Sequence, residues 1–214
     1  MKLHTYFRSS AAYRVRIALN LKGLAYETVP VHLVRDGGEQ KQAAYKELNP
    51  LGLVPTLETE STAFTQSLAI IEWLNESYPD QPLLPAQADA RAHVRAIAHT
   101  IACDIHPLNN LRVLAYLTKT LEVTDAQKNA WYRHWVEEGL LAVERLLVTT
   151  GSRGRYCYGD TPTMADCCLV PQVFNARRFN CTLDHLPTLR GIVQACEDLG
   201  PFQAASPAQQ VDCE

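Results

Sequence analysis

The pattern of apolar positions changes once along this chain, and the change predicts two regions of different fold. Short runs in the first region alternate apolar with polar residues or gather β-branched ones, as strands do: 2–6, 26–33, 54–57 and 63–64. Three other stretches there repeat apolar residues every three or four positions, as helices do: 11–22, 43–48 and 66–74. The order is βαβ followed by ββα, so we expect the first two strands to be parallel.

Only helical spacing remains after a proline-containing linker at residues 78–88. One long helix is predicted over 90–117, with a kink where Pro107 removes a backbone donor. Three further helices are predicted after hydroxyl or proline start signals, and they begin near Thr124, Thr163 and Pro187.

The connections and ends complete this outline. A turn is expected at 151–154, and a polar tail from Ser206 onward is expected to fray. The fold class predicted is therefore an α/β domain over residues 1–82, followed by an all-helical domain over residues 88–214.

Composition narrows the classes of function. The chain has 214 residues, is 47% hydrophobic and has a net charge of −3, which gives no reason to expect nucleic acid or an anionic membrane as a partner. It shows no membrane-span or signal-peptide pattern. Its seven cysteines lack zinc-ligand spacing, so no metal site is predicted, and a reducing cytoplasm is the expected location.

The start of the first helix is the main candidate for chemistry. Ser9 and Ser10 stand where an N-cap belongs, at the positive end of the helix dipole. A hydroxyl there can donate to a thiolate, and the dipole favours ionisation of a bound thiol. The alternative is that both serines only cap the helix.

Two other places in the first domain could bind a ligand. A cis bond at Val54–Pro55 would leave the Val54 backbone free to pair with an extended peptide, whereas a trans bond would make Pro55 an ordinary edge proline. Gln66 and Ser67 form a second helix start, which could hold a carboxylate or could simply cap the helix.

The long predicted helix contains a polar group on one flank. His106, Asn109, Asn110 and Arg112 share that flank by helical spacing, which indicates either a cleft or subunit contact, or a solvated face. Arginine binds carboxylates in a planar fork, and the arginines nearest these features are Arg8, Arg112 and Arg178. Asp166 occupies the third position of a capping box, and a folding role is expected for it.

As a set, these motifs resemble one family, the zeta-class glutathione transferases. The resemblance rests on segments in the family's order: 7–10 with 13–19, 49–50 with 54–57, 66–72, 103–110 and 159–173. It implies a thioredoxin-like domain followed by a helical domain, a homodimer, glutathione as cofactor and a small dicarboxylate as substrate. The implied reaction is the cis–trans isomerisation of maleylacetoacetate to fumarylacetoacetate, or of maleylpyruvate.

The resemblance also implies roles for individual residues. Catalysis would use Ser9, Ser10 and Arg8, and the substrate would be held by Arg8, Arg112 and Arg178. The glutathione-binding residues implied are Ser9, Ser10, Ala11, Gln40, Val54, Pro55, Gln66, Ser67, Asp104, His106 and Asn110. The cis form of Val54–Pro55 belongs to the same expectation.

One position departs from the family, and two other functions compete. Ala11 stands where zeta enzymes that act on maleylacetoacetate commonly have cysteine. The missing thiol is compatible with the isomerase interpretation, but it argues against any side activity that depends on that thiol. A general glutathione transferase acting on small acidic electrophiles is the first competitor. A binding protein without activity is the second, and the intact Ser9–Ser10 pair argues against it.

Overall fold

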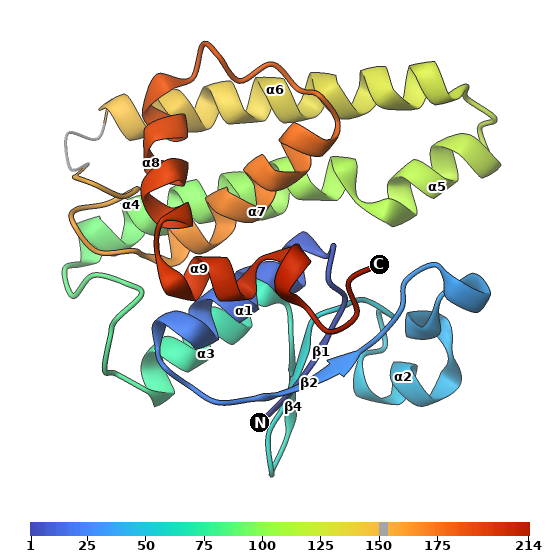
Figure 1. Cartoon of the computed structure of the whole chain (residues 1–214), viewed down its shortest axis with the longest axis horizontal. Helices are drawn as coiled ribbons and strands as arrows, with labels where there is room; N and C mark the ends of the chain where they lie inside the picture. Colours follow the sequence, from blue (N-terminus) through green and yellow to red (C-terminus); the bar gives the residue numbers. More distant parts are fainter. Residues whose placement is uncertain (150–153) are drawn as a thin grey trace. The chain divides into compact units, whose positions relative to one another are not determined.

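The computed structural model describes residues 1–149 and 154–214, and these form two compact units. The first unit comprises Met1–Leu84 together with Glu197–Glu214, and the second comprises Pro85–Cys196 (Figure 1). The sequence pattern assigned all of 88–214 to the helical domain, whereas the last eighteen of those residues belong with the sheet. The expected turn at 151–154 falls, except for Gly154, outside the described residues.

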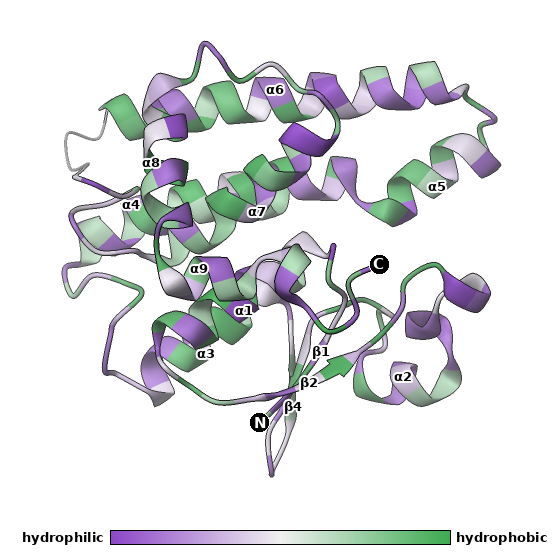
Figure 2. Ribbon diagram, in the orientation of Figure 1, coloured by the Kyte–Doolittle hydropathy of each residue, from purple (hydrophilic) through white to green (hydrophobic). Residues whose placement is uncertain are grey.

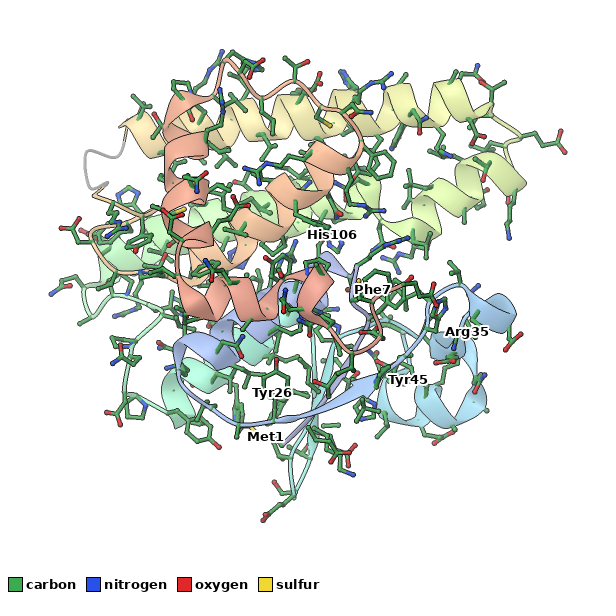
Figure 3. All side chains as sticks on the ribbon, in the orientation of Figure 1. Met1, Phe7, Tyr26, Arg35, Tyr45 and His106 are labelled. Atoms are coloured by element: carbon green, nitrogen blue, oxygen red, sulfur yellow. The ribbon has the colours of Figure 1, made fainter. Side chains whose placement is uncertain are left out.

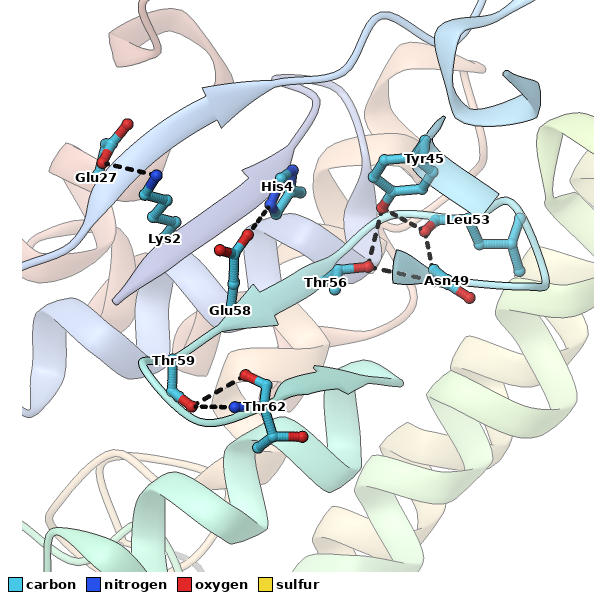
Figure 4. Close-up of polar contacts among 10 residues, drawn as sticks. All are labelled: Lys2, His4, Glu27, Tyr45, Asn49, Leu53, Thr56, Glu58, Thr59 and Thr62. Atoms are coloured by element: carbon cyan, nitrogen blue, oxygen red, sulfur yellow. Dashed lines mark hydrogen bonds and ion pairs between the residues drawn. The ribbon is translucent and has the colours of Figure 1, made fainter. Parts of the chain in front are cut away.

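A four-stranded mixed sheet forms the centre of the first unit. Its strands are β1 (Lys2–Thr5), β2 (Glu27–Pro30), β3 (Thr56–Glu58) and β4 (Ala63–Thr65), in the order β2-β1-β3-β4. β1 pairs parallel with β2 and antiparallel with β3, as βαβ followed by ββα requires. His4 on β1 also meets Glu58 on β3, with 3.0 Å between Nε2 and Oε2 (Figure 4).

Helices pack on this sheet through apolar faces. α1 (Ser10–Leu21) packs against α3 (Ser67–Ser77), and α2 (Ala43–Leu48) lies between them in the sequence. Burying each large aliphatic side chain contributes roughly 1.5–3 kcal/mol, and fully buried members of this core include Ile17, Leu19, Ile70, Ile71 and Leu74. The fold class predicted from the sequence, a thioredoxin-like domain followed by helices, is confirmed.

The end of the chain is held in the first unit, which corrects the expectation of a frayed tail. α9 (Gly200–Ala205) packs against α1, with Phe202 only 1% exposed. The short helix η5 (Pro207–Gln209) follows, and its Pro207 is buried. The sequence pattern missed both helices because each has at most six residues, too few to show a period.

The second unit is all-helical in its described residues. Its longer helices are α4 (Ala88–His99), α5 (Leu111–Lys119), α6 (Asp125–Thr149), α7 (Met164–Arg178) and α8 (Pro187–Glu197). α4 packs against α7, and α6 contacts both α5 and α7. Figure 2 shows hydrophilic and hydrophobic residues interleaved along α6, as expected of a helix with one face in a core.

The long helix predicted over 90–117 is broken rather than kinked. After α4 the chain forms a π-helical segment, η3 (Thr100–Ile105), and a 3-10 segment, η4 (His106–Asn109), before α5 begins. Pro107 provides no backbone donor, and Asn110 adopts an extended conformation and caps α5 by accepting from the Arg112 N–H.

Candidate active site

Ser9 is the N-cap of α1 and keeps part of its hydroxyl available. Its φ and ψ are −70° and 116°, and its Oγ accepts a hydrogen bond of 3.2 Å from the Ala12 N–H. That bond uses a lone pair and leaves the hydroxyl proton able to donate. Ser9 is partly exposed, whereas Ser10 is only 4% exposed. Exposure therefore favours Ser9 over Ser10 as the hydroxyl that meets a ligand.

Arg8 lies beside this helix start and is oriented by an aromatic ring. Its guanidinium carbon is 4.7 Å from the centroid of the Phe7 ring, within the range of a cation–π contact. Phe7 is only 2% exposed and belongs to a cluster of buried side chains that also contains Tyr6, Val31, Tyr45 and Val54. The buried Phe7 ring therefore gives the exposed guanidinium of Arg8 a fixed contact.

The start of α3 differs from that of α1 because no side chain caps it. Gln66 takes the N-cap position with φ 69° and makes no side-chain cap bond, so the first-turn N–H groups lack the acceptor that a cap would supply. A non-glycine residue at positive φ costs about 1–3 kcal/mol, and such residues gather at ligand sites. The α3 start therefore suits an anion.

A buried arginine supports Ser67 at the same place, and the sequence pattern did not identify it. Arg14 is 1% exposed, and its Nη1 donates to Ser67 Oγ over 3.2 Å. Because this oxygen accepts from Arg14, its own proton can be donated elsewhere. This bond joins the second turn of α1 to the start of α3 within the first unit. An arginine within the apolar run of residues 12–19 is the signal that could have revealed it.

The Val54–Pro55 peptide bond is cis, as the family resemblance implies. The turn before it is fixed at Leu53, whose carbonyl accepts from Asn49 Nδ2 at 2.7 Å and from the Tyr45 hydroxyl at 2.8 Å (Figure 4). Among the described residues, no backbone hydrogen bond outside the regular elements uses the Val54 N–H or C=O. These two groups can therefore pair with an extended ligand.

Gln40 is placed in the first unit but is largely covered. It belongs to the 3-10 helix η2 (Glu39–Lys41), is 6% exposed, and donates from Nε2 to the Leu33 carbonyl. Glycine is needed at Gly38, because its φ is +104° and a Cβ there would lie 2.7 Å from the same Leu33 carbonyl. Gln40 retains one amide proton with which it could reach a ligand.

The polar group predicted on one helical flank is divided between two elements, η4 and α5. His106 begins η4, Asn110 caps α5, and Arg112 is exposed in the first turn of α5. Asp104, which the resemblance adds to the site, is the second-last residue of η3 and is exposed. A shared flank was therefore wrong, because the break at Pro107 resets the helical phase. Asn109 is 6% exposed, and its amide has no hydrogen-bond partner among the described residues.

Arg178 ends α7 and is held by its own helix. Its Nη1 donates to Asn175 Oδ1 at 3.1 Å, and its guanidinium carbon lies 5.9 Å and 5.8 Å from the rings of Phe174 and Phe179. Arg178 thus resembles Arg8 in being an exposed cation supported by aromatic rings. The neighbouring Arg177 is also exposed.

Asp166 has the folding role expected of it. It closes a capping box with Thr163, is fully buried, and also accepts from the Cys157 N–H at 2.9 Å. Burial raises the pKa of its carboxyl, although hydrogen bonds from Cys157 and Thr163 act in the opposite direction. Burial also raises the pKa of the Cys157 thiol, which makes it unreactive.

Neither a metal site nor a membrane span is found in the parts of the chain that the structure describes. No group of three His, Cys, Asp or Glu side chains there could hold a metal ion. No helix there is long and apolar enough to cross a bilayer. All seven cysteines are described, and none forms a disulfide.

Comparison with known proteins identifies the family. Residues 8–77 match the model of the glutathione S-transferase N-terminal domain. A maleylpyruvate isomerase of Ralstonia sp. is 51% identical, and the alignment covers 99% of both chains. A solved structure of a maleylpyruvate isomerase, described as a bacterial glutathione S-transferase of the zeta class, is 50% identical with a TM-score of 0.97 and covers 100% of both chains. The chain belongs to the zeta-class glutathione S-transferases.

A third relative shows what a member of this class can hold. The maleylacetoacetate isomerase of Methylobacterium extorquens is 36% identical, has a TM-score of 0.96, covers 100% of both chains, and was solved with malonate and GSH bound.

In the present zeta-class chain, Ala11 is partly exposed in the first turn of α1, where a methyl group offers no hydrogen bond.

Proposed function

We propose that this chain is a glutathione-dependent cis–trans isomerase of short dicarboxylates in which a cis double bond is conjugated to a ketone. Maleylacetoacetate is the first substrate proposed. Maleylpyruvate is the second, because relatives with that name reach 51% identity over nearly the full length. The observation that carries the proposal is the N-cap at Ser9. Its hydroxyl oxygen accepts from the Ala12 N–H, while its proton faces no internal acceptor among the described residues.

The residues of the first unit fit glutathione. Ser9 offers a donor to the thiolate, the unused Val54 N–H and C=O offer a strand-like pair to the peptide, and Ser67 at the uncapped start of α3 offers a donor to a carboxylate. Gln40 with its remaining proton is proposed for the glycyl end. Bound glutathione supplies a thiolate that adds to the double bond, allows rotation about it, and then leaves.

The protein residues have three tasks in this reaction. Ser9 and the α1 dipole hold the thiol deprotonated, since a thiol with a pKa near 8.5 is only a few per cent ionised at pH 7. Arg8, Arg112 and Arg178 bind the substrate carboxylates and the charge that develops on its ketone oxygen. Ser10, Ala11 and Pro55 shape the pocket, and Asp104, His106 and Asn110 are proposed as further glutathione contacts.

The same proposal includes a homodimer in the cytoplasm. Seven cysteines without a disulfide suit a reducing compartment. Light scattering of the purified protein should give twice the chain mass of 23.9 kDa. A monomer at micromolar concentration would contradict the dimer while leaving the proposed chemistry standing.

The test is a turnover assay with each substrate, with and without glutathione. We expect trans product only when glutathione is present, with no net loss of glutathione. Steady consumption of glutathione with a stable conjugate would favour a general transferase acting on acidic electrophiles. No glutathione-dependent change of either substrate would contradict the proposed function.

A further inference from the structure

One buried guanidinium binds the backbone of the segment that leads from β1 to Ser9. Arg16 is 0% exposed, and its Nη1 and Nη2 donate to the carbonyls of Tyr6 at 3.3 Å and Phe7 at 3.0 Å. Its Nε donates to the Ala205 carbonyl at the end of α9, over 2.9 Å. The strand-to-helix connection before Ser9 is therefore tied to the last helix of the chain.

Asp212 holds the same connection by its other backbone group. The Phe7 N–H donates to Asp212 Oδ2 at 2.9 Å, so both polar backbone groups of Phe7 are bound by residues from outside the connection. The Ser9 N–H in turn donates to the Tyr6 carbonyl at 2.9 Å and closes the turn. The position of Ser9 thus depends on a residue 203 positions further along the chain.

A second contact fixes the tail that carries Asp212. Glu214 Oε1 lies 2.8 Å from Arg35 Nη2 and 3.2 Å from His32 Nε2. His32 Nδ1 accepts from the Arg35 N–H at 2.8 Å, and Nε2 is the ring nitrogen that faces Glu214. Phe7 and Arg35, which mark the two anchor points, are labelled in Figure 3. Both contacts lie within the first unit.

The carboxylate of Asp212 is poorly satisfied for a purely structural anchor. Its Oδ1 is buried and has no hydrogen-bond partner among the described residues. An unsatisfied buried acceptor costs stability. Burial lowers the pKa of Arg16 to about 10, and the charges of Tyr26, Tyr13 and Asp212 act against that shift.

We propose that Asp212 is a positioning residue, which fixes the Phe7–Ser9 connection so that the Ser9 hydroxyl faces a bound thiol. This inference rests on the proposed function, because it assigns Asp212 to the same site. It acts through the Phe7 N–H and touches neither glutathione nor substrate. The tail of the chain, which the sequence pattern treats as a polar end, thereby becomes part of the thiol site.

The test compares three variants of the full chain. Asp212→Ala removes the acceptor, Asp212→Asn keeps an oxygen that can accept from the Phe7 N–H, and Glu214→Ala releases the outer anchor only. The first measurement needs no ligand and follows amide hydrogen exchange at Phe7 and Ser9. We expect exchange to rise about tenfold in Asp212→Ala and to stay within about threefold of the unmodified chain in the other two.

The second measurement is the pH profile of kcat and the KM for glutathione. Asp212→Ala should lower kcat about fivefold and move the thiol ionisation to higher pH, with KM within about twofold, because the donor is misplaced while the binding groups remain. Asp212→Asn should restore most of kcat. A melting temperature recorded for each variant separates this from loss of fold.

Two outcomes would overturn the inference. One is unchanged exchange and unchanged kcat in Asp212→Ala. The other is equal loss in Asp212→Asn and Asp212→Ala, since it would assign the effect to the charge and not to the bond with Phe7. Failure of the proposed function has a different signature, namely an unmodified chain without isomerase activity, and the exchange data then decide alone whether Asp212 fixes the connection.

Discussion

The helix starts at Ser9 and Thr163 both have a hydroxyl cap, but they use their hydrogen-bonding capacity differently. Thr163 Oγ1 accepts from the Ala165 N–H and donates to Asp166 Oδ2, and Asp166 also accepts from the Thr163 and Cys157 N–H groups. Thr163 is 5% exposed and Asp166 is 0% exposed. Ser9 has one described side-chain bond, from Ala12, and is partly exposed.

This difference separates a structural cap from one that can serve a ligand. At Thr163 the hydroxyl of the capping box both accepts and donates within the protein, so it has no proton for a ligand. We call this capping box of Thr163 and Asp166 the closed cap, and the helix start at Ser9 the open cap. At Ser9 a proton, the helix dipole and solvent access remain together. The α3 start is more open still, because Gln66 provides no side-chain cap.

The largest effect should be on stability, when Asp166 is removed from the closed cap at Thr163. Asp166→Ala leaves the Cys157 and Thr163 N–H groups buried without an acceptor, and we expect the free energy of unfolding to fall by about 3–5 kcal/mol. Asp166→Asn keeps one acceptor and should lose about half as much. Chemical denaturation measures both, and a loss below about 1 kcal/mol for Asp166→Ala would show that the cap is not structural.

The next largest effect is expected at the arginines proposed to bind the substrate, because a dianionic substrate needs cations to hold its carboxylates. Arg178→Met and Arg112→Met should each raise KM for the acid substrate about tenfold and leave glutathione affinity within about twofold. If an arginine also stabilises developing charge, kcat falls as well.

Arg177→Met is the matched control, since its side chain points about 100° away around α7. It should be close to neutral in the same steady-state assay. Equal losses at Arg177 and Arg178 would indicate general electrostatics, and no loss at Arg112 or Arg178 would place the substrate elsewhere and favour a general transferase.

A smaller effect is expected at the second open helix start. Ser67→Ala removes one donor to the proposed carboxylate of glutathione and should weaken glutathione binding about fivefold, as calorimetry can measure. Thr163→Ala, at the closed cap, should cost stability without changing glutathione affinity. A reversal of these two results would remove the distinction between open and closed caps.

The sequence predicted the parts of this molecule that depend on local pattern. The βαβ and ββα order, the caps at Ser9 and Thr163 and the short helix at 43–48 follow from periodicity and start signals. The cis form of Val54–Pro55 came from family resemblance, because its residues alone favour trans.

What the sequence missed depends on contacts between distant residues. The bond from Arg14 to Ser67 spans 53 positions and the bond from Phe7 to Asp212 spans 205, and no local period records either. The helix break after η3 was underestimated because apolar spacing continues through Pro107 although the backbone path does not.

The most direct test of the account is the ionisation of the thiol of bound glutathione. Ultraviolet absorbance of the thiolate, followed against pH, gives its pKa in the unmodified chain, in Ser9→Ala and in Ser10→Ala. We predict that Ser9→Ala raises this pKa by about one unit, equivalent to about 1.4 kcal/mol, and lowers turnover at least about tenfold, with Ser10→Ala close to the unmodified chain. An unchanged pKa in Ser9→Ala, or a shift in Ser10→Ala alone, would contradict the role assigned to Ser9.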